Sequence, residues 1–194
     1  MDMRILRIDG WMSYWELNWL YDSVLQVPDG GLIVEIGAWK GRSTAALYTA
    51  ASNNKAVITI DTWLGQPDLR DTTHHEATEI NLFYVFMLNM ILLGIKPEVY
   101  EKGNLGAQYL YMESVDAAPL FDNDSISMLF IDGDHSKAGE DIDIWYNKVK
   151  SDGIICGHDW HWSCVSEAVN KRFAVDMVVD TIWIKKKKRL SLSP

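Results

Sequence analysis

One stretch of the chain, residues 33–44, constrains the fold more than any other. It reads I-V-E-I-G-A-W-K-G-R-S-T: an apolar run, a turn with two glycines, and a helix-like segment. The apolar residues suit a strand buried on both faces, and Gly37 and Gly41 let the backbone turn tightly and approach a ligand. Glu35 interrupts the apolar run, and a carboxylate is costly to bury unless it binds something. We predict a nucleotide cradle in which Glu35 contacts the ligand's ammonium or hydroxyl groups; the alternative is a plain turn with an ion-paired glutamate.

The spacing of the glycines limits which nucleotide fits. Gly37 and Gly41 give E-x-G-x-x-x-G rather than the dinucleotide pattern G-x-G-x-x-G, and Arg42 stands where a phosphate-binding loop needs lysine. A second apolar run, residues 56–60, ends at Asp61, where doubly wound folds place an acid against ribose hydroxyls. The pattern therefore favours an adenosine without phosphates.

Apolar runs alternate with amphipathic stretches along the chain, which predicts an α/β fold. The first helix, residues 13–26, opens with Ser13 and Glu16 spaced as a capping box. The other expected helices are 42–51, 77–93, 137–150 and 163–173, and the other expected strands are 109–112, 126–131, 154–157 and 177–184. The helix at 77–93 is apolar on most faces, so it should be buried on more than one side, either by core packing or by contact within a homo-oligomer.

Polar side chains gather at the ends of two expected strands, in I-D-G-D-H-S (131–136) and G-H-D-W (157–160). Ligands of parallel α/β sheets lie outside the carboxyl ends of the strands, so these residues should converge. Carboxylates and imidazoles together can hold a divalent cation. The alternative is that the aspartates cap the following helix and the histidines make structural hydrogen bonds. The converging residues are Asp132, Asp134, His135, His158 and Asp159.

With these phrases in place, the chain resembles the class I S-adenosylmethionine-dependent methyltransferases from about residue 10 to about residue 185. The four phrases I-V-E-I-G-A-W-K-G-R-S-T, I-D-T-W-L-G, I-D-G-D-H-S and G-H-D-W are similar to those of methyltransferase domain family 24, whose relatives include macrocin-type and catechol-type O-methyltransferases. The resemblance implies a single Rossmann-like domain over residues 1–184. Its central sheet would be mostly parallel, with helices on both faces and an antiparallel last strand.

The resemblance also implies a cofactor site. Glu35, Gly37 and Gly41 would line the methionine part of S-adenosylmethionine, Asp61 would hold the ribose, and Glu113 with Ser114 would lie beside the adenine. The family phrase usually has glycine and aspartate before that serine, whereas this chain has Met112 and Glu113. The cofactor set is completed by Ala38, Ser43, Thr62 and Asp132.

Methyl transfer to oxygen needs a deprotonated hydroxyl, which a metal ion or a base can supply. In the catechol-type relatives, aspartates ending the fourth strand and following the fifth bind magnesium, and these match Asp132 and Asp159. His158 is the third expected metal ligand, with Mg²⁺ the expected ion, and the relatives' catalytic lysine falls at His135. Asp132 and His135 are therefore the expected catalytic residues. His74 and His75, in the loop after Asp61, are minor candidates for the reaction.

The composition of the chain limits the binding partners that we expect. The chain has 194 residues and a formal net charge of −9, which suits one domain and argues against a nucleic-acid ligand. No apolar stretch approaches the roughly 18 residues that span a bilayer, and no secretory leader is evident, so we expect a cytoplasmic protein without a membrane partner. Residues 185–194, which begin with a basic run, are expected to form a loose tail.

These observations predict an O-methyltransferase that acts on a hydroxyl of a small molecule, a sugar or phenolic metabolite, with metal assistance. Two alternatives remain open. One is a cofactor-binding protein of the same fold without methyl-transfer activity. The other is an NAD-dependent oxidoreductase, against which the missing G-x-G-x-x-G counts.

Overall fold

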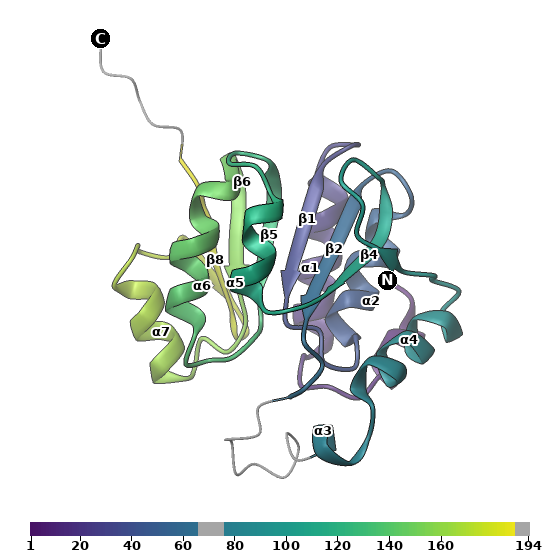
Figure 1. Ribbon diagram of the computed structural model, residues 1–194. Helices are drawn as coiled ribbons and strands as arrows, with labels where there is room; N and C mark the ends of the chain where they lie inside the picture. The colour runs from purple at the N-terminus through teal and green to yellow at the C-terminus, as the bar shows by residue number, and fades with distance from the viewer. Residues whose placement is uncertain (66–75, 189–194) are drawn as a thin grey trace.

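A computed structural model describes residues 1–65 and 76–188, and the structural statements below concern those residues. They form one eight-stranded sheet with the strand order β3-β4-β2-β1-β5-β6-β8-β7 (Figure 1). Every pair from β3 to β6 is parallel, whereas β8 pairs antiparallel with both β6 and β7. The expected α/β class, with an antiparallel last strand, is confirmed. The strands are β1 Leu32–Ile36, β2 Ala56–Asp61, β3 Glu98–Val99, β4 Gly106–Tyr111, β5 Ile126–Ile131, β6 Val149–Gly157, β7 Met177–Val179 and β8 Ile182–Lys186.

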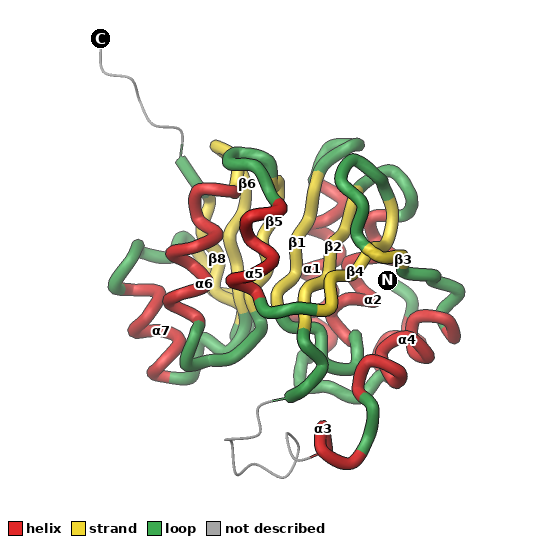
Figure 2. Tube along the Cα trace, in the orientation of Figure 1, coloured by secondary structure: helices red, strands yellow, loops and turns green. Residues whose placement is uncertain are grey.

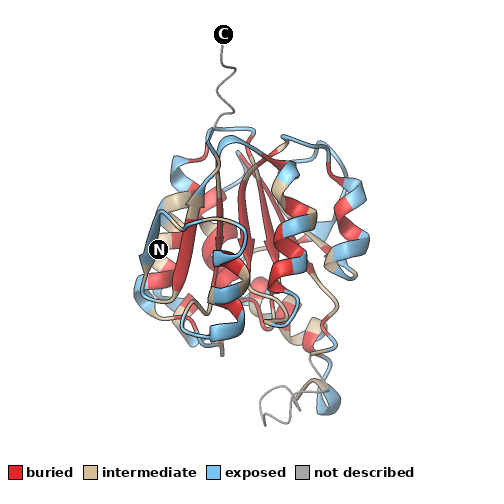
Figure 3. Cartoon of the chain, turned by 90° about the vertical axis from the view of Figure 1, so that its left-hand side faces the viewer, coloured by how far each residue is buried: buried red, intermediate tan, exposed pale blue. Residues whose placement is uncertain are grey.

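Helices cover both faces of the sheet, as Figure 2 shows. Side chains alternate along each strand, so Ile33 packs into the core beneath α1, α2 and α4, and Val34 packs into the core beneath α5, α6 and α7. The central strands are buried along most of their length (Figure 3). The helices are α1 Tyr14–Gln26, α2 Arg42–Ala51, α3 Glu76–Glu79, α4 Leu82–Leu92, α5 Ser114–Ala117, α6 Ala138–Trp145 and α7 Ser163–Asn170, with short 3₁₀ helices at Met3–Arg7, Ala118–Leu120 and Tyr146–Lys148. No helix in the described ranges has the length and apolarity needed to cross a bilayer.

The N-terminus of α1 has the expected capping box. The Ser13 hydroxyl accepts a hydrogen bond from the Glu16 backbone N–H, and the Glu16 carboxylate accepts one from the Ser13 backbone N–H at 2.7 Å. Two backbone donors that the helix leaves unpaired are thereby satisfied. This cap places the first turn of α1, including the buried Glu16, at a fixed position beside the sheet.

The prediction of a single helix over residues 77–93 is wrong. The structure has α3 and α4 instead, because the Asn81 side chain accepts a hydrogen bond from the Tyr84 backbone N–H and starts a new helix there. Core packing buries only one stripe of α4, so it does not cover the helix on more than one side. Burial of the other faces by contact within a homo-oligomer stays a prediction. The buried residues are Leu82, Phe86 and Met90, and the exposed apolar residues are Tyr84, Leu88, Ile91 and Leu92.

Several other boundaries differ from expectation. The strand expected at 109–112 is β4, which starts at Gly106, and the strand expected at 154–157 is β6, which starts at Val149. The helices expected at 137–150 and 163–173 are shorter. The region 177–184, expected to supply one or two strands, forms two, as that prediction allowed. The expected tail starts too early, because β8 extends to Lys186 and the Lys185 ammonium pairs with Asp176 at 3.0 Å. Residues 189–194 lie outside the described residues.

The turn after β1 predicts a specific sensitivity. Gly37 has a φ of +86°, and an added Cβ would lie 2.2 Å from the Asp132 carbonyl oxygen. Gly94 has a similar φ of +82° but no atom within 4 Å of an added Cβ. We expect Gly94→Ala to cost about 1 kcal/mol of unfolding free energy from backbone strain alone, and Gly37→Ala at least about 3 kcal/mol because backbone must also move. Urea denaturation of both variants measures this difference, and equal losses would contradict the close approach.

Candidate active site

A cavity of about 550 Å³ opens at the carboxyl ends of β1, β2, β5 and β6. Its size is in the range of small-molecule sites. The structure brings most of the sequence-predicted residues to its wall, as expected for strand ends that meet at one edge of a parallel sheet. Those residues are Gly37, Ala38, Ser43, Asp61, Thr62, Glu113, Ser114, Asp132, Asp134, His135, His158 and Asp159.

Glu35 is not on this wall, and the expectation that it contacts the ligand is contradicted. It has no exposed surface, and its carboxylate accepts hydrogen bonds from the hydroxyls of Ser43, Thr44 and Thr59 at 2.6–2.8 Å. These bonds join β1 to the first turn of α2 and to β2. Burial raises the pKa of Glu35 to about 7. Glu35 is therefore an internal anchor of the cradle.

Gly41 also lies off the cavity wall, contrary to expectation. It precedes α2 with a φ of +92°, and an added Cβ would lie 2.6 Å from the Met90 side chain and 2.9 Å from Phe86. Glycine is needed there because the turn packs against α4, and the residue does not face the cavity.

Arg42 explains why the loop is not a phosphate cradle. Its guanidinium donates hydrogen bonds to the backbone carbonyls of Leu6, Gly10 and Met12. The cationic group that a phosphate-binding loop would direct at its ligand is used here to hold the N-terminal segment against α2. This contact agrees with the sequence pattern, which favours an adenosine without phosphates.

Asp61 shapes the glycine turn from the end of β2. One carboxylate oxygen accepts hydrogen bonds from the backbone N–H groups of Ala38 (2.7 Å) and Trp39 (3.0 Å), and the other accepts one from the Trp63 N–H at 2.6 Å. Burial raises the pKa of Asp61, although these backbone donors act in the opposite direction. Asp61 thus holds the turn in place and also lines the cavity.

Ser114 and Glu113 lie on the wall formed by the start of α5. The Ser114 hydroxyl donates to Asp141 at 2.6 Å and accepts from the Trp145 indole N–H at 2.8 Å. Glu113 is paired with Lys137 at 3.5 Å. Burial raises the pKa of Asp141 to about 6. The two hydrogen bonds of Ser114 hold its hydroxyl between α5 and α6.

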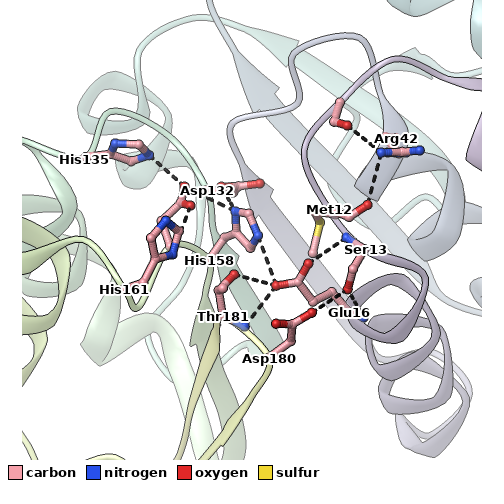
Figure 4. Close-up of polar contacts among 12 residues, drawn as sticks. Met12, Ser13, Glu16, Arg42, Asp132, His135, His158, His161, Asp180 and Thr181 are labelled. Atoms are coloured by element: carbon pink, nitrogen blue, oxygen red, sulfur yellow. Dashed lines mark hydrogen bonds and ion pairs between the residues drawn. The ribbon is translucent and has the colours of Figure 1, made fainter.

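His158, directly after β6, is surrounded by carboxylates (Figure 4). Its Nδ1 lies 3.3 Å from Asp132 and 3.2 Å from Asp159, and its Nε2 lies 3.2 Å from Glu16. Burial by itself lowers the pKa of His158, but the surrounding carboxylates outweigh it and raise the pKa to about 12. The ligand atoms of Asp132, His158 and Asp159 lie within 4.8 Å of one another, which is the arrangement of a potential cation site.

His135 approaches the same cluster from the loop after β5. Its Nε2 lies 2.8 Å from the Asp159 carboxylate, and that hydrogen bond raises the pKa of His135. The imidazole is half-buried beside Trp162, with ring centroids 5.3 Å apart. The Asp134 carboxylate instead accepts hydrogen bonds from the backbone N–H and hydroxyl of the nearby Ser136. Of the aspartates in I-D-G-D-H-S, only Asp132 joins the cluster.

Sequence reasoning missed several residues of the wall. Glu16 was assigned only to the helix cap, although the fold directs its second carboxylate oxygen at His158. Lys40 was passed over as a turn residue, yet its ammonium pairs with Asp9 at 2.7 Å and Glu76 at 2.6 Å. No local pattern reveals such contacts, because the partners are 31 and 36 residues away. His74 and His75 lie outside the described residues.

The architecture is that of a class I methyltransferase, and comparison with known proteins supports this. Residues 34–160 match the model of the methyltransferase domain family. The chain belongs to that family, as the four sequence phrases indicated, and is an S-adenosylmethionine-dependent methyltransferase. A search of curated protein sequences gave no match.

Solved structures share the fold at low sequence identity. SAH-bound methyltransferase PaMTH1 of Podospora anserina is 11% identical with a TM-score of 0.68, covering 97% of this chain and 89% of that one. The O-methyltransferase TomG of Streptomyces achromogenes, involved in tomaymycin synthesis and solved with SAM, is 13% identical with a TM-score of 0.66, covering 97% and 91%. An O-methyltransferase of Bacillus cereus in complex with SAH is 13% identical with a TM-score of 0.58, covering 88% and 77%.

The buried carboxylate of Glu35 predicts a pH-dependent stability. Because the folded-state pKa of about 7 lies above the usual glutamate pKa of 4.5, the native state binds the proton more tightly than the unfolded chain. The resulting stabilisation is present below pH 4.5 and is lost as the pH rises through 7, by about 3 kcal/mol. Glu35→Gln keeps the shape without the charge and should remove this loss. Urea denaturation of both proteins at pH 5 and pH 8 measures it, and parallel pH profiles would contradict the assignment.

Proposed function

We propose that the protein transfers the methyl group of S-adenosylmethionine to a hydroxyl of a small molecule, a sugar or a phenolic metabolite, with the help of a divalent cation. The observation that carries this proposal is the juxtaposition, in one cavity, of a glycine turn without phosphate-binding features and a cluster of two aspartates and two histidines. The solved O-methyltransferases that share the fold support transfer to oxygen.

In this proposal the cofactor lies along the ends of β1 and β2. The backbone of Gly37 and Ala38 faces the methionine part, Ser43 and Thr62 flank it, and Asp61 faces the ribose. Asp61 is suited to this role because its backbone hydrogen bonds prevent the carboxylate from turning away. Glu113 and Ser114 would border the adenine, and their contacts with Lys137 and Asp141 keep that wall in place.

The donor set of Asp132, His158 and Asp159 fits a divalent cation, with Mg²⁺ or Mn²⁺ favoured by the carboxylates. A bound cation would lower the pKa of the acceptor hydroxyl. Asp132 also borders the cofactor region through the backbone contact between Ile36 and Asp132, so the two sites are adjacent. We propose that these three residues hold the acceptor oxygen near the methyl group.

His135 is the proposed general base. Its Nε2 is hydrogen-bonded to the Asp159 carboxylate, which orients the ring. Nδ1 is then the ring nitrogen that can accept the proton of the acceptor hydroxyl. As the oxygen–carbon bond forms, the carbon–sulfur bond breaks in line, and S-adenosylhomocysteine leaves with the sulfur electron pair. The hydroxyl proton stays on His135 until it is released to solvent.

The first test separates an enzyme from a cofactor-binding protein of the same fold. Purified protein is incubated with S-adenosylmethionine, Mg²⁺ and a panel of sugars and phenols, and S-adenosylhomocysteine is quantified. We expect product with at least one acceptor, and a decrease of about 10²–10⁴-fold in kcat for His135→Gln with the dissociation constant for S-adenosylmethionine within twofold. Cofactor binding without product for any acceptor would favour the cofactor-binding protein without methyl-transfer activity. Turnover unaffected by chelators would contradict the proposed role of a divalent cation.

The second test concerns the cofactor contact of Asp61. Asp61→Asn places an amide N–H₂ where the carboxylate accepts from backbone N–H groups, so we expect binding of S-adenosylmethionine to weaken by about 1–3 kcal/mol. Calorimetric titration gives the affinity. The control is Asp143→Asn, which removes a carboxylate from an exposed pair with Arg172. An unchanged affinity of Asp61→Asn for S-adenosylmethionine would contradict the proposed contact between Asp61 and the cofactor.

A further inference from the structure

Glu16 reaches the cluster of two aspartates and two histidines from a part of the chain that precedes the family-matched residues 34–160. It lies in the first turn of α1 and is 2% exposed. One carboxylate oxygen, Oε2, accepts from the Ser13 backbone N–H in the capping box. The other, Oε1, faces away from the cap and contacts Thr181 and His158 (Figure 4). The helix cap uses only Oε2, so Oε1 can bind partners outside the cap.

The contacts of Oε1 determine how the His158 ring is held. Thr181, in the turn between β7 and β8, donates to it through its backbone N–H at 3.0 Å and through its hydroxyl. His158 Nε2 lies 3.2 Å from the same oxygen. An ionised carboxylate only accepts hydrogen bonds, so Nε2 must carry its hydrogen toward Glu16. Nδ1 is then directed at Asp132 and Asp159, on the cavity side.

We infer that Glu16 is a positioning residue that fixes the His158 imidazole so that Nδ1 faces the proposed cation site. A histidine that binds a metal usually donates its other ring N–H to a carboxylate or carbonyl, which sets its orientation and tautomer. Glu16 supplies that carboxylate, and Thr181 holds it in place. The inference rests on the proposed function, since it assigns His158 Nδ1 as a ligand.

Burying a third carboxylate near Asp132 and Asp159 is unfavourable unless its oxygens are satisfied. The four donors from Ser13, Thr181 and His158 meet that requirement. A role in helix capping alone does not explain the arrangement, because the cap uses only Oε2, whereas Oε1 contacts Thr181 and His158. The ring of His158 is thus held between α1 and the two aspartates.

Three variants separate positioning from capping and from charge. Glu16→Met keeps the length of the side chain but accepts no hydrogen bond. Glu16→Gln removes the charge and keeps an oxygen that can face His158. Ser13→Ala removes the cap hydroxyl and leaves the contact between Glu16 and His158 intact. The probe is Mn²⁺, whose binding is followed by electron paramagnetic resonance of the free ion, and the second readout is the nuclear magnetic resonance signal of the His158 Nε2–H.

We expect Glu16→Met to weaken Mn²⁺ binding about 10–100-fold and to abolish the slowly exchanging Nε2–H signal. Glu16→Gln should retain the signal and lose less affinity than Glu16→Met, and Ser13→Ala should leave both readouts within twofold of the wild type. Equal weakening in Glu16→Gln and Glu16→Met, with the signal retained in Glu16→Gln, would assign the effect to charge and overturn the inference. Equal weakening in Ser13→Ala would assign it to the cap and also overturn it.

The same experiment distinguishes failure of the inference from failure of the proposed function. If the wild type does not bind Mn²⁺, the metal-assisted part of the proposed function is wrong. In that case the Nε2–H signal alone tests the inference. Loss of the signal in Glu16→Met, with retention in Ser13→Ala, supports positioning of His158 by Glu16. Persistence of the signal in Glu16→Met refutes the inference.

Discussion

The close approach of the β1 turn to the end of β5 is the constraint on which the rest of the site depends. The Asp132 backbone N–H donates to the Ile36 carbonyl at 2.7 Å, and the Gly37 N–H donates to the Ile60 carbonyl at 2.9 Å. Three strand ends are thereby joined, with no room for a side chain at Gly37. Because Asp61 ends β2 and Asp132 follows β5, the same contact brings the proposed cofactor and cation residues to opposite sides of one turn.

Buried charge is the second organising element. Glu35 is isolated from solvent and held only by hydroxyls, so burial raises its pKa, whereas Asp159 accepts from two imidazoles, which lower its pKa. Carboxylates of one chain are thus placed in environments that shift their pKa values in opposite directions.

Much of the fold and part of the site could be predicted from local sequence. The strand at Ile126–Ile131 and the helix at Arg42–Ala51 have the expected bounds, because an apolar run or a glycine start leaves little choice. The division of the expected helix at 77–93 depends on a side-chain cap at Asn81 that the apolar pattern concealed. Glu35 was assigned to a ligand because the hydroxyls that satisfy it come from two other elements, and no single-segment pattern shows them.

The residues that sequence reasoning missed share a physical origin. Glu16 and Thr181 lie outside the matched family residues and are 165 positions apart, yet they meet because α1 packs beside the antiparallel strands β7 and β8. The matched segment supplies a cradle and a cluster, and the two ends of the chain close around His158. Family phrases therefore predict which strand ends carry the candidate site residues, whereas the orientation of a side chain such as His158 depends on contacts between elements far apart in the sequence.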